Sequence, residues 1–220
     1  MLFDDLKSAN ADAWRAYTHH AFVEGMADGS LAEASFRHYL VQDYLFLIHF
    51  ARAYALAIYH SRTLEEMRAG LDGVKAILDV EMGLHVQLCG EWGLIPAEIE
   101  QAPESRATLA YTRYVLETGL RGDLLDLHVA LSPCVIGYAE IAERIAGPHG
   151  QAAGGNPYGV WINEYAGEAY QALADDARKK LDMLAGGPVS STRFDDLSRV
   201  FSQATRLEAD FWQMGLDCAD

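Results

Sequence analysis

The segment Phe36-Arg-His-Tyr-Leu-Val-Gln-Asp-Tyr-Leu-Phe-Leu-Ile-His-Phe-Ala-Arg-Ala-Tyr54 shows the spacing that runs through nearly the whole chain. Its apolar residues recur every three or four positions, which is typical of one face of an α-helix. A β-strand would instead alternate apolar and polar residues, and no segment of the chain shows convincing alternation of β-branched residues. The sequence therefore predicts an all-α protein.

The predicted helices extend in both directions from this segment, and capping residues indicate where they begin. Ser30 with Glu33, and Thr63 with Glu66, have the spacing of a capping box. Pro133 lies inside one predicted helix and is expected to kink it. The breaks between helices are short turns, so we expect a single domain over residues 1–220. The predicted helices cover about residues 2–18, 30–59, 63–92, 105–120, 123–146, 157–185 and 190–216, with an interruption at 20–29 and a loop at 147–155.

The composition is that of a globular protein, because half of the 220 residues are apolar and 22% are charged. Seventeen basic and 32 acidic residues give a net charge of −15, which makes nucleic acid and anionic membranes poor partners. Three cysteines cannot form a disulfide framework and lack the paired spacing of a zinc site. The first residues do not resemble a signal peptide and no uncharged apolar run is long enough to span a membrane, so we expect a cytoplasmic protein.

Three polar side chains interrupt apolar helix faces. Asp43 lies among aromatic residues in the opening segment, Glu208 lies at the centre of an apolar stripe in the last helix, and Cys134 follows Pro133. A buried carboxylate is costly unless it is paired, and burial raises its pKa toward the range useful for acid and base catalysis. Each residue alone also fits a structural role, a cysteine as a small core residue and an acid as a partner of a tyrosine. Together they favour a shared pocket.

Metal and haem sites find less support in the sequence. A di-iron bundle needs two Glu-x-x-His motifs, whereas Glu81 and His85 are four residues apart and are expected to pair on a helix surface. His19 and His20 are candidate haem ligands, or else a helix-end pair bonded to backbone carbonyls. The zinc deaminase signature and glycine-rich phosphate loops are absent from the sequence.

Five local motifs, in this order along the chain, resemble the TenA or thiaminase II family. They are His20-Ala-Phe-Val-Glu-Gly-Met-Ala-Asp-Gly-Ser-Leu31, Phe36-Arg-His-Tyr-Leu-Val-Gln-Asp-Tyr-Leu45, Ala130-Leu-Ser-Pro-Cys134, Tyr158-Gly-Val-Trp-Ile-Asn-Glu-Tyr165 and Glu208-Ala-Asp-Phe-Trp212. The resemblance implies an all-α fold of the haem-oxygenase-like type without haem, and a homotetramer that needs no metal or other cofactor. It also implies hydrolysis of 4-amino-5-aminomethyl-2-methylpyrimidine to hydroxymethylpyrimidine in thiamin salvage, with thiamin itself as another possible substrate.

The resemblance also assigns roles to residues of this chain. Cys134 resembles the nucleophile that adds to the pyrimidine ring, Glu208 the catalytic acid and base, and Asp43 the residue that binds the aminopyrimidine edge. The aromatic substrate-binding positions that it implies are Phe46, Tyr111, Tyr138 and Tyr165.

Two positions depart from the family pattern. Phe46 stands where some members have a tyrosine, so one pocket hydroxyl is either missing or supplied from elsewhere. Ala21 stands where a proline often follows the histidine. Losing one neutral hydrogen bond costs about 0.5–1.5 kcal/mol, which is enough to change substrate preference. Two other functions stay open at this point. They are a haem- or iron-dependent oxygenase or oxidase on the same fold, and a non-catalytic pyrimidine-binding regulator.

Overall fold

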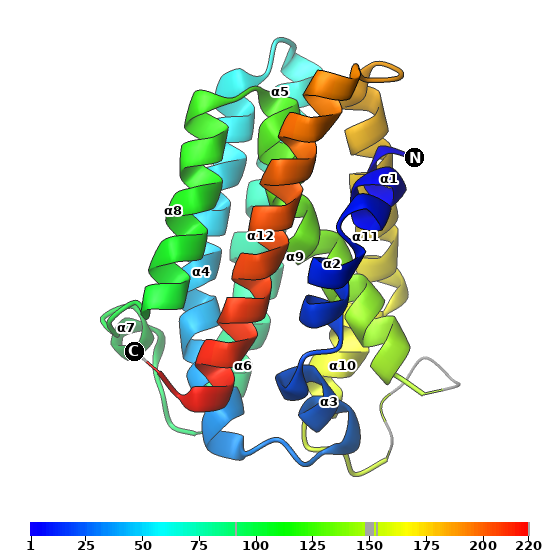
Figure 1. Cartoon of the computed structure of the whole chain (residues 1–220). Coiled ribbons are helices and arrows are strands. Elements are labelled where there is room, and N and C mark those ends of the chain that lie inside the picture. Colours follow the sequence, from blue (N-terminus) through cyan, green and yellow to red (C-terminus); the bar gives the residue numbers. More distant parts are fainter. Residues whose placement is uncertain (91, 148–151, 153, 220) are drawn as a thin grey trace. The chain divides into compact units, whose positions relative to one another are not determined.

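The computed structural model describes residues 1–90, 92–147, 152 and 154–219. Of the described residues 82% are helical and none forms a strand, which confirms the predicted all-α class. The elements in chain order are α1 (Leu2–Ala9), α2 (Ala11–Thr18), α3 (Ala21–Asp28), α4 (Glu33–His60), α5 (Leu64–Lys75), the π-helix η1 (Ala76–Glu81), α6 (Met82–Gly90), α7 (Pro96–Ile99), α8 (Arg106–Arg121), α9 (Leu124–Ile145), α10 (Gly159–Ala166), α11 (Glu168–Ala185) and α12 (Ser191–Asp217) (Figure 1).

Several predicted helix starts are confirmed because their capping side chains are in place. Thr63 Oγ1 accepts from the Glu66 amide at 3.1 Å, and the Glu66 carboxylate accepts from the Thr63 amide at 3.1 Å. Ser105 accepts from the amide of Thr108 at the start of α8. Asp123 accepts from the amide of Asp126 at the start of α9. These oxygens satisfy amide groups that have no partner inside the helix.

Other predicted boundaries are wrong. The helix predicted over 2–18 is divided at Asn10, whose backbone leaves the helical conformation and whose amide and side chain both donate to the carbonyl of Leu6. The predicted interruption at 20–29 is mostly the helix α3, which His20 caps. Ser30 does not open α4 with a capping box, because its own amide donates to the Asp28 carboxylate and α4 begins only at Glu33.

The segment predicted as one helix over 157–185 is also divided. The structure has α10 and α11 there, with Gly167 in extended backbone between them. Asn156 accepts from the amide of Tyr158, so it caps a turn before α10. Residues 148–151 and 153 of the loop predicted over 147–155 lie outside the described residues.

The chain divides into two compact units, and α9 and α12 contribute residues to both. Unit 2 comprises Glu33–Leu127 and Met214–Asp220. Its central element is α4, which packs against α5, η1, α6, α7 and α8. Figure 1 shows α4 and α8 side by side. The buried Gln42 of α4 accepts from the amide of Ser105 and the hydroxyl of Thr108, and so holds the start of α8 in place.

Unit 1 comprises Met1–Ala32 and His128–Gln213. Its core is a cluster of fully buried rings from α1, α2, α3 and α12. Trp14 stacks on Phe201 at 5.6 Å, and Trp212 stacks on Phe22 at 5.1 Å. Gly137 of α9 allows close packing here, because a Cβ at that position would lie 2.4 Å from the ring of Tyr17. The expectation that both units form one domain stays a prediction.

The helix α9 is long and apolar enough to cross a membrane, with a mean hydropathy of 1.4 over its most apolar window. However, 78% of that window is buried inside the protein. Core helices have the same length and composition, and burial of this extent agrees with that role.

Candidate functional site

Asp43 is held by two side chains that share one of its oxygens. The Tyr39 hydroxyl donates to Asp43 Oδ2 at 2.8 Å, and His85 Nε2 lies 2.7 Å from the same oxygen. The Asp43 side chain is only 5% exposed. Among the residues that the structure describes, none hydrogen-bonds the other oxygen, Oδ1. The carboxylate is therefore fixed through Oδ2 by these two side chains.

His85 is the residue that the sequence interpretation misplaced. The prediction that it pairs with Glu81 on a helix surface is wrong, because the ring is fully buried. Its Nδ1 lies 2.9 Å from the backbone carbonyl of Glu81 and its Nε2 contacts Asp43. Burial acts to lower the pKa of His85, but the hydrogen bond and negative charge of Asp43 outweigh it and raise that pKa above 6.5.

Two predicted pocket residues of unit 2 contact each other, and one of them lies close to Asp43 along α4. Phe46 lies one turn after Asp43 on α4, and its ring centroid lies 4.9 Å from that of Tyr111 on α8. Both side chains are buried. Unit 2 therefore brings together the rings of Phe46 and Tyr111, and Asp43 lies one turn before Phe46 on α4.

Two other predicted aromatic residues meet in unit 1. The rings of Tyr138 on α9 and Tyr165 on α10 lie 5.2 Å apart in an edge-to-face contact. Tyr138 also stacks on Trp212 of α12 at 5.3 Å, and Tyr165 contacts Trp161 at 4.5 Å. Such packing fixes the orientation of the rings, so the tyrosine hydroxyls are held in defined positions.

Cys134 lies at a place where α9 has been adapted to a proline. Pro133 has no amide hydrogen, so the carbonyl of Val129 loses its usual helical donor. The Ser132 hydroxyl donates to that carbonyl at 2.8 Å, and α9 continues through Pro133 without interruption. Tyr17 donates to the Pro133 carbonyl at 3.2 Å. The Ser-Pro pair therefore sets the backbone that carries Cys134, whose exposed fraction is 7%.

The arrangement within unit 1 favours an approach of Cys134 to Glu208. Cys134 lies one turn before Tyr138 on α9, and Glu208 lies one turn before Trp212 on α12. Those two rings stack. In Figure 1 both helices run from the upper to the lower side of the view. Glu208 is 1% exposed. The convergence of Asp43 with Cys134 and Glu208 stays a prediction.

The candidate haem ligands have local roles. His20 caps α3, because its Nδ1 accepts from the amide of Phe22 at 3.2 Å. His19 Nδ1 lies 3.0 Å from the hydroxyl of Thr18, which itself donates to the carbonyl of Trp14. Both histidines lie at helix ends, and their ring nitrogens contact the Thr18 hydroxyl and the Phe22 amide where backbone carbonyls were expected.

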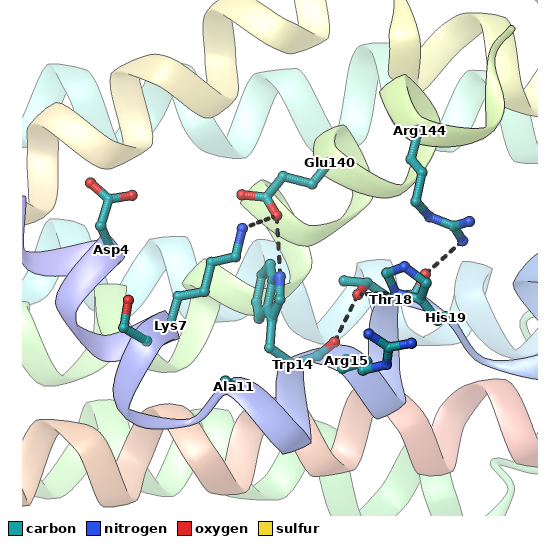
Figure 2. A pocket seen from close by; sticks show the side chains of 10 residues that line it. Asp4, Lys7, Ala11, Trp14, Arg15, Thr18, His19, Glu140 and Arg144 are labelled. Atoms are coloured by element: carbon teal, nitrogen blue, oxygen red, sulfur yellow. Dashed lines mark hydrogen bonds and ion pairs between the residues drawn. The ribbon is translucent and has the colours of Figure 1, made fainter.

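An open pocket of about 560 Å³ in unit 1 is formed by residues other than the predicted ones. In Figure 2 the side chains of Lys7 and Trp14 point toward Glu140. Lys7 Nζ and Trp14 Nε1 both donate to Glu140 Oε2, at 2.7 and 3.1 Å, and Arg178 donates to Oε1 at 2.7 Å. Because Glu140 ties together α1, α2, α9 and α11, we interpret it as a structural brace.

Replacing Glu140 with alanine is expected to lower the free energy of unfolding by about 1–3 kcal/mol, because three donors lose their acceptor. The side chains of Lys7 and Glu140 are 37% and 23% exposed, so solvent screening keeps the loss toward the lower end. Urea unfolding of both proteins measures this loss in the free energy of unfolding. Glu117→Ala, which removes an exposed pair with Arg121, is the control and should cost at most about 0.5 kcal/mol. Equal losses in the two variants would contradict the brace.

Comparisons with known proteins show what the chain is similar to. The profile of the TENA/THI-4/PQQC family matches residues 8–218. An aminopyrimidine aminohydrolase from Halalkalibacterium halodurans is 39% identical over 202 residues, which cover 91% of this chain and 89% of that protein. The crystal structure of a TenA family transcription regulator from Silicibacter sp. TM1040 matches with a TM-score of 0.92 and 45% identity, covering 98% of this chain and 96% of that chain.

A more distant structure identifies the fold type. A domain from Shewanella denitrificans OS217, described as having a heme oxygenase-like fold, matches with a TM-score of 0.72 at 13% identity. The match covers 98% of this chain and 92% of that domain. At this identity the likeness concerns the fold alone, and it confirms the predicted haem-oxygenase-like type.

Proposed function

The chain belongs to the TENA/THI-4/PQQC family, and on that premise we propose that it hydrolyses 4-amino-5-aminomethyl-2-methylpyrimidine to hydroxymethylpyrimidine and ammonia. The related aminohydrolase from Halalkalibacterium halodurans supports an aminopyrimidine substrate. The observation that carries the proposal is the state of Asp43. A buried carboxylate with one oxygen held by Tyr39 and His85 and the other available is suited to accept an N–H from an exocyclic amine.

In the proposed reaction Cys134 acts first. Its sulfur, as the thiolate, adds to a ring carbon of the pyrimidine, and a ring nitrogen takes up a proton from Glu208. The ring loses its aromaticity, and its electron pair then expels ammonia from the methylene carbon, with a proton completing the leaving group. Water adds to that carbon, the carbon–sulfur bond breaks, and the aromatic ring returns with Cys134 free. The sum is one water consumed and one ammonia released.

The other residues bind and orient the ring. Tyr138, Tyr165, Tyr111 and Phe46 offer flat apolar surfaces suited to a heteroaromatic ring, and their packing holds them rigid. Phe46 offers no hydroxyl, so the polar contacts fall to Asp43 and the tyrosines. Glu208 is buried, which favours transfer of a proton between the acid and a bound ring over exchange with water.

The proposal is tested by measuring ammonia release from 4-amino-5-aminomethyl-2-methylpyrimidine by the purified protein. We expect turnover with equal amounts of ammonia and hydroxymethylpyrimidine, because each catalytic cycle releases one of each. Thiamin is assayed in parallel as the alternative substrate. Absence of turnover with the aminomethyl compound would contradict the proposal.

A second candidate function is pyrimidine binding without turnover. The structure from Silicibacter sp. TM1040 is described as a transcription regulator, and it is 45% identical to this chain. The same assay separates the two functions. Saturable binding of hydroxymethylpyrimidine without release of ammonia would select the regulator, whereas turnover selects the hydrolase.

A further inference from the structure

The contacts of Asp43 indicate which ligands the site accepts, and this inference rests on the proposed function. We propose that His85 positions Asp43 so that only Oδ1 accepts a ligand, and that His85 thereby selects ligands with an N–H donor at this edge. Tyr39 and His85 both contact Oδ2, at 2.8 and 2.7 Å. A carboxylate oxygen has two lone-pair positions in its plane, so Oδ2 has none left for a ligand.

The proton positions on His85 follow from its two neighbours. Nδ1 faces the backbone carbonyl of Glu81, which can only accept, so Nδ1 carries a hydrogen. Nε2 faces Asp43, and a carboxylate also can only accept, so Nε2 carries a hydrogen as well. The ring is then an imidazolium paired with a carboxylate inside the protein. The described groups that act on it are Asp43 from α4 and Glu81 from η1, and both stabilise the positive charge.

This pairing determines how a pyrimidine edge is recognised. A free carboxyl group can meet an aminopyrimidine with both oxygens, one accepting from the amine and one sharing a proton with the ring nitrogen. With Oδ2 filled, Asp43 keeps one acceptor and no donor. An exocyclic amine satisfies it, whereas an oxo group at the same position would place two acceptors in contact. A site with buried polar groups rejects such a mismatch strongly.

The local helix structure explains how His85 reaches Asp43. The residues before α6 form the π-helix η1, and Glu81 is its last residue. Single π-helical turns occur often at functional sites, because the extra residue shifts the side chains that follow. The Glu81 carbonyl accepts from the His85 ring four residues later, which orients the ring toward α4. Because α6 and η1 both pack against α4, the pair is fixed within one unit.

The inference is tested by ligand binding, which does not depend on turnover. The probes are hydroxymethylpyrimidine and its 4-oxo analogue, titrated into the full chain. Wild type is expected to prefer the amino compound by at least about 10²-fold. In His85→Leu the Asp43 carboxyl loses the charged donor that fixes Oδ2 and is free to turn, so the preference for the amino compound should fall to less than about 10-fold.

Two further variants guard against a purely structural effect. The amide nitrogen of glutamine occupies nearly the position of His85 Nε2, so His85→Gln should restore most of the preference. Tyr39→Phe frees one lone-pair position on Oδ2, so it should reduce the preference for the amino compound over the 4-oxo analogue, but less than His85→Leu does. His60→Leu is the matched control, because His60 is a histidine of the same unit that contacts the carbonyl of Gly119 and should leave the preference unchanged.

The outcomes separate this inference from the proposed function. Retention of the amino preference in His85→Leu would overturn the inference, and so would a wild type that binds both probes equally. If wild type shows the preference, His85→Leu loses it, and no ammonia is released in the turnover assay, then the inference stands and the hydrolase proposal fails.

Discussion

Cys134→Ala is expected to lower the rate of ammonia release by about 10³-fold or more while the affinity for hydroxymethylpyrimidine stays within about 3-fold of wild type. The reason is that the sulfur acts only in the bond-making step, where it converts an aromatic ring with a poor leaving group into an addition product that expels ammonia. Its contribution to binding is that of a small buried side chain. Loss of kcat without loss of affinity would identify Cys134 as a covalent catalyst.

The chain supplies a matched control in Cys89. It is buried, as Cys134 is, and lies in unit 2, one turn after His85 on α6. Burial raises the pKa of Cys89 to about 11, so it stays a neutral thiol at physiological pH. Cys89→Ala should therefore keep the wild-type rate. Cys134→Ala with more than about a tenth of the wild-type rate would contradict covalent catalysis.

A sulfur adduct gives an independent measurement. Rapid mixing with substrate followed by acid quenching and mass spectrometry should reveal a protein-bound pyrimidine in wild type when water addition is slow. The adduct should be absent from Cys134→Ala and present in Cys89→Ala. This readout separates a nucleophile from a residue that only packs against the ring.

The sequence predicted the class of fold because the helical spacing of apolar residues is a local property. The helix starts at Thr63 and Asp123 were predicted for the same reason, since each capping side chain lies within three residues of its amide. The division at Asn10 was missed because the Asn10 side chain also bonds to Ser198 of α12, a distant contact that the local spacing of residues does not show.

The site was only partly predictable. Asp43 was identified because a carboxylate on an apolar helix face is unusual, and its neighbour Tyr39 lies four residues earlier on the same face, where it could have been found. His85 could not be found in this way, because it is 42 residues from Asp43 and approaches it only through the packing of α6 on α4. Its spacing from Glu81 suggested a surface pair, but the ring bonds to the Glu81 backbone.

Asp43→Asn is expected to reduce kcat/KM for the aminomethyl substrate by about 10³-fold, which corresponds to about 4 kcal/mol. Tyr39 and His85 both donate toward the Oδ2 position, so the asparagine side chain will turn its carbonyl oxygen there. Its NH2 group then takes the Oδ1 position and meets the substrate amine donor to donor. The substitution removes the charge and also reverses the hydrogen-bonding character of the site.

The reversed hydrogen-bonding character makes this variant more informative than one that only loses activity. An NH2 group at Oδ1 suits an oxo ligand, so Asp43→Asn should bind the 4-oxo analogue more tightly than wild type does. Asp72→Asn, an exposed acid of the same unit, is the control and should change neither measurement. If Asp43→Asn binds both ligands equally less tightly, Asp43 only supports the fold. If it instead prefers the 4-oxo analogue, Asp43 contacts the pyrimidine edge directly.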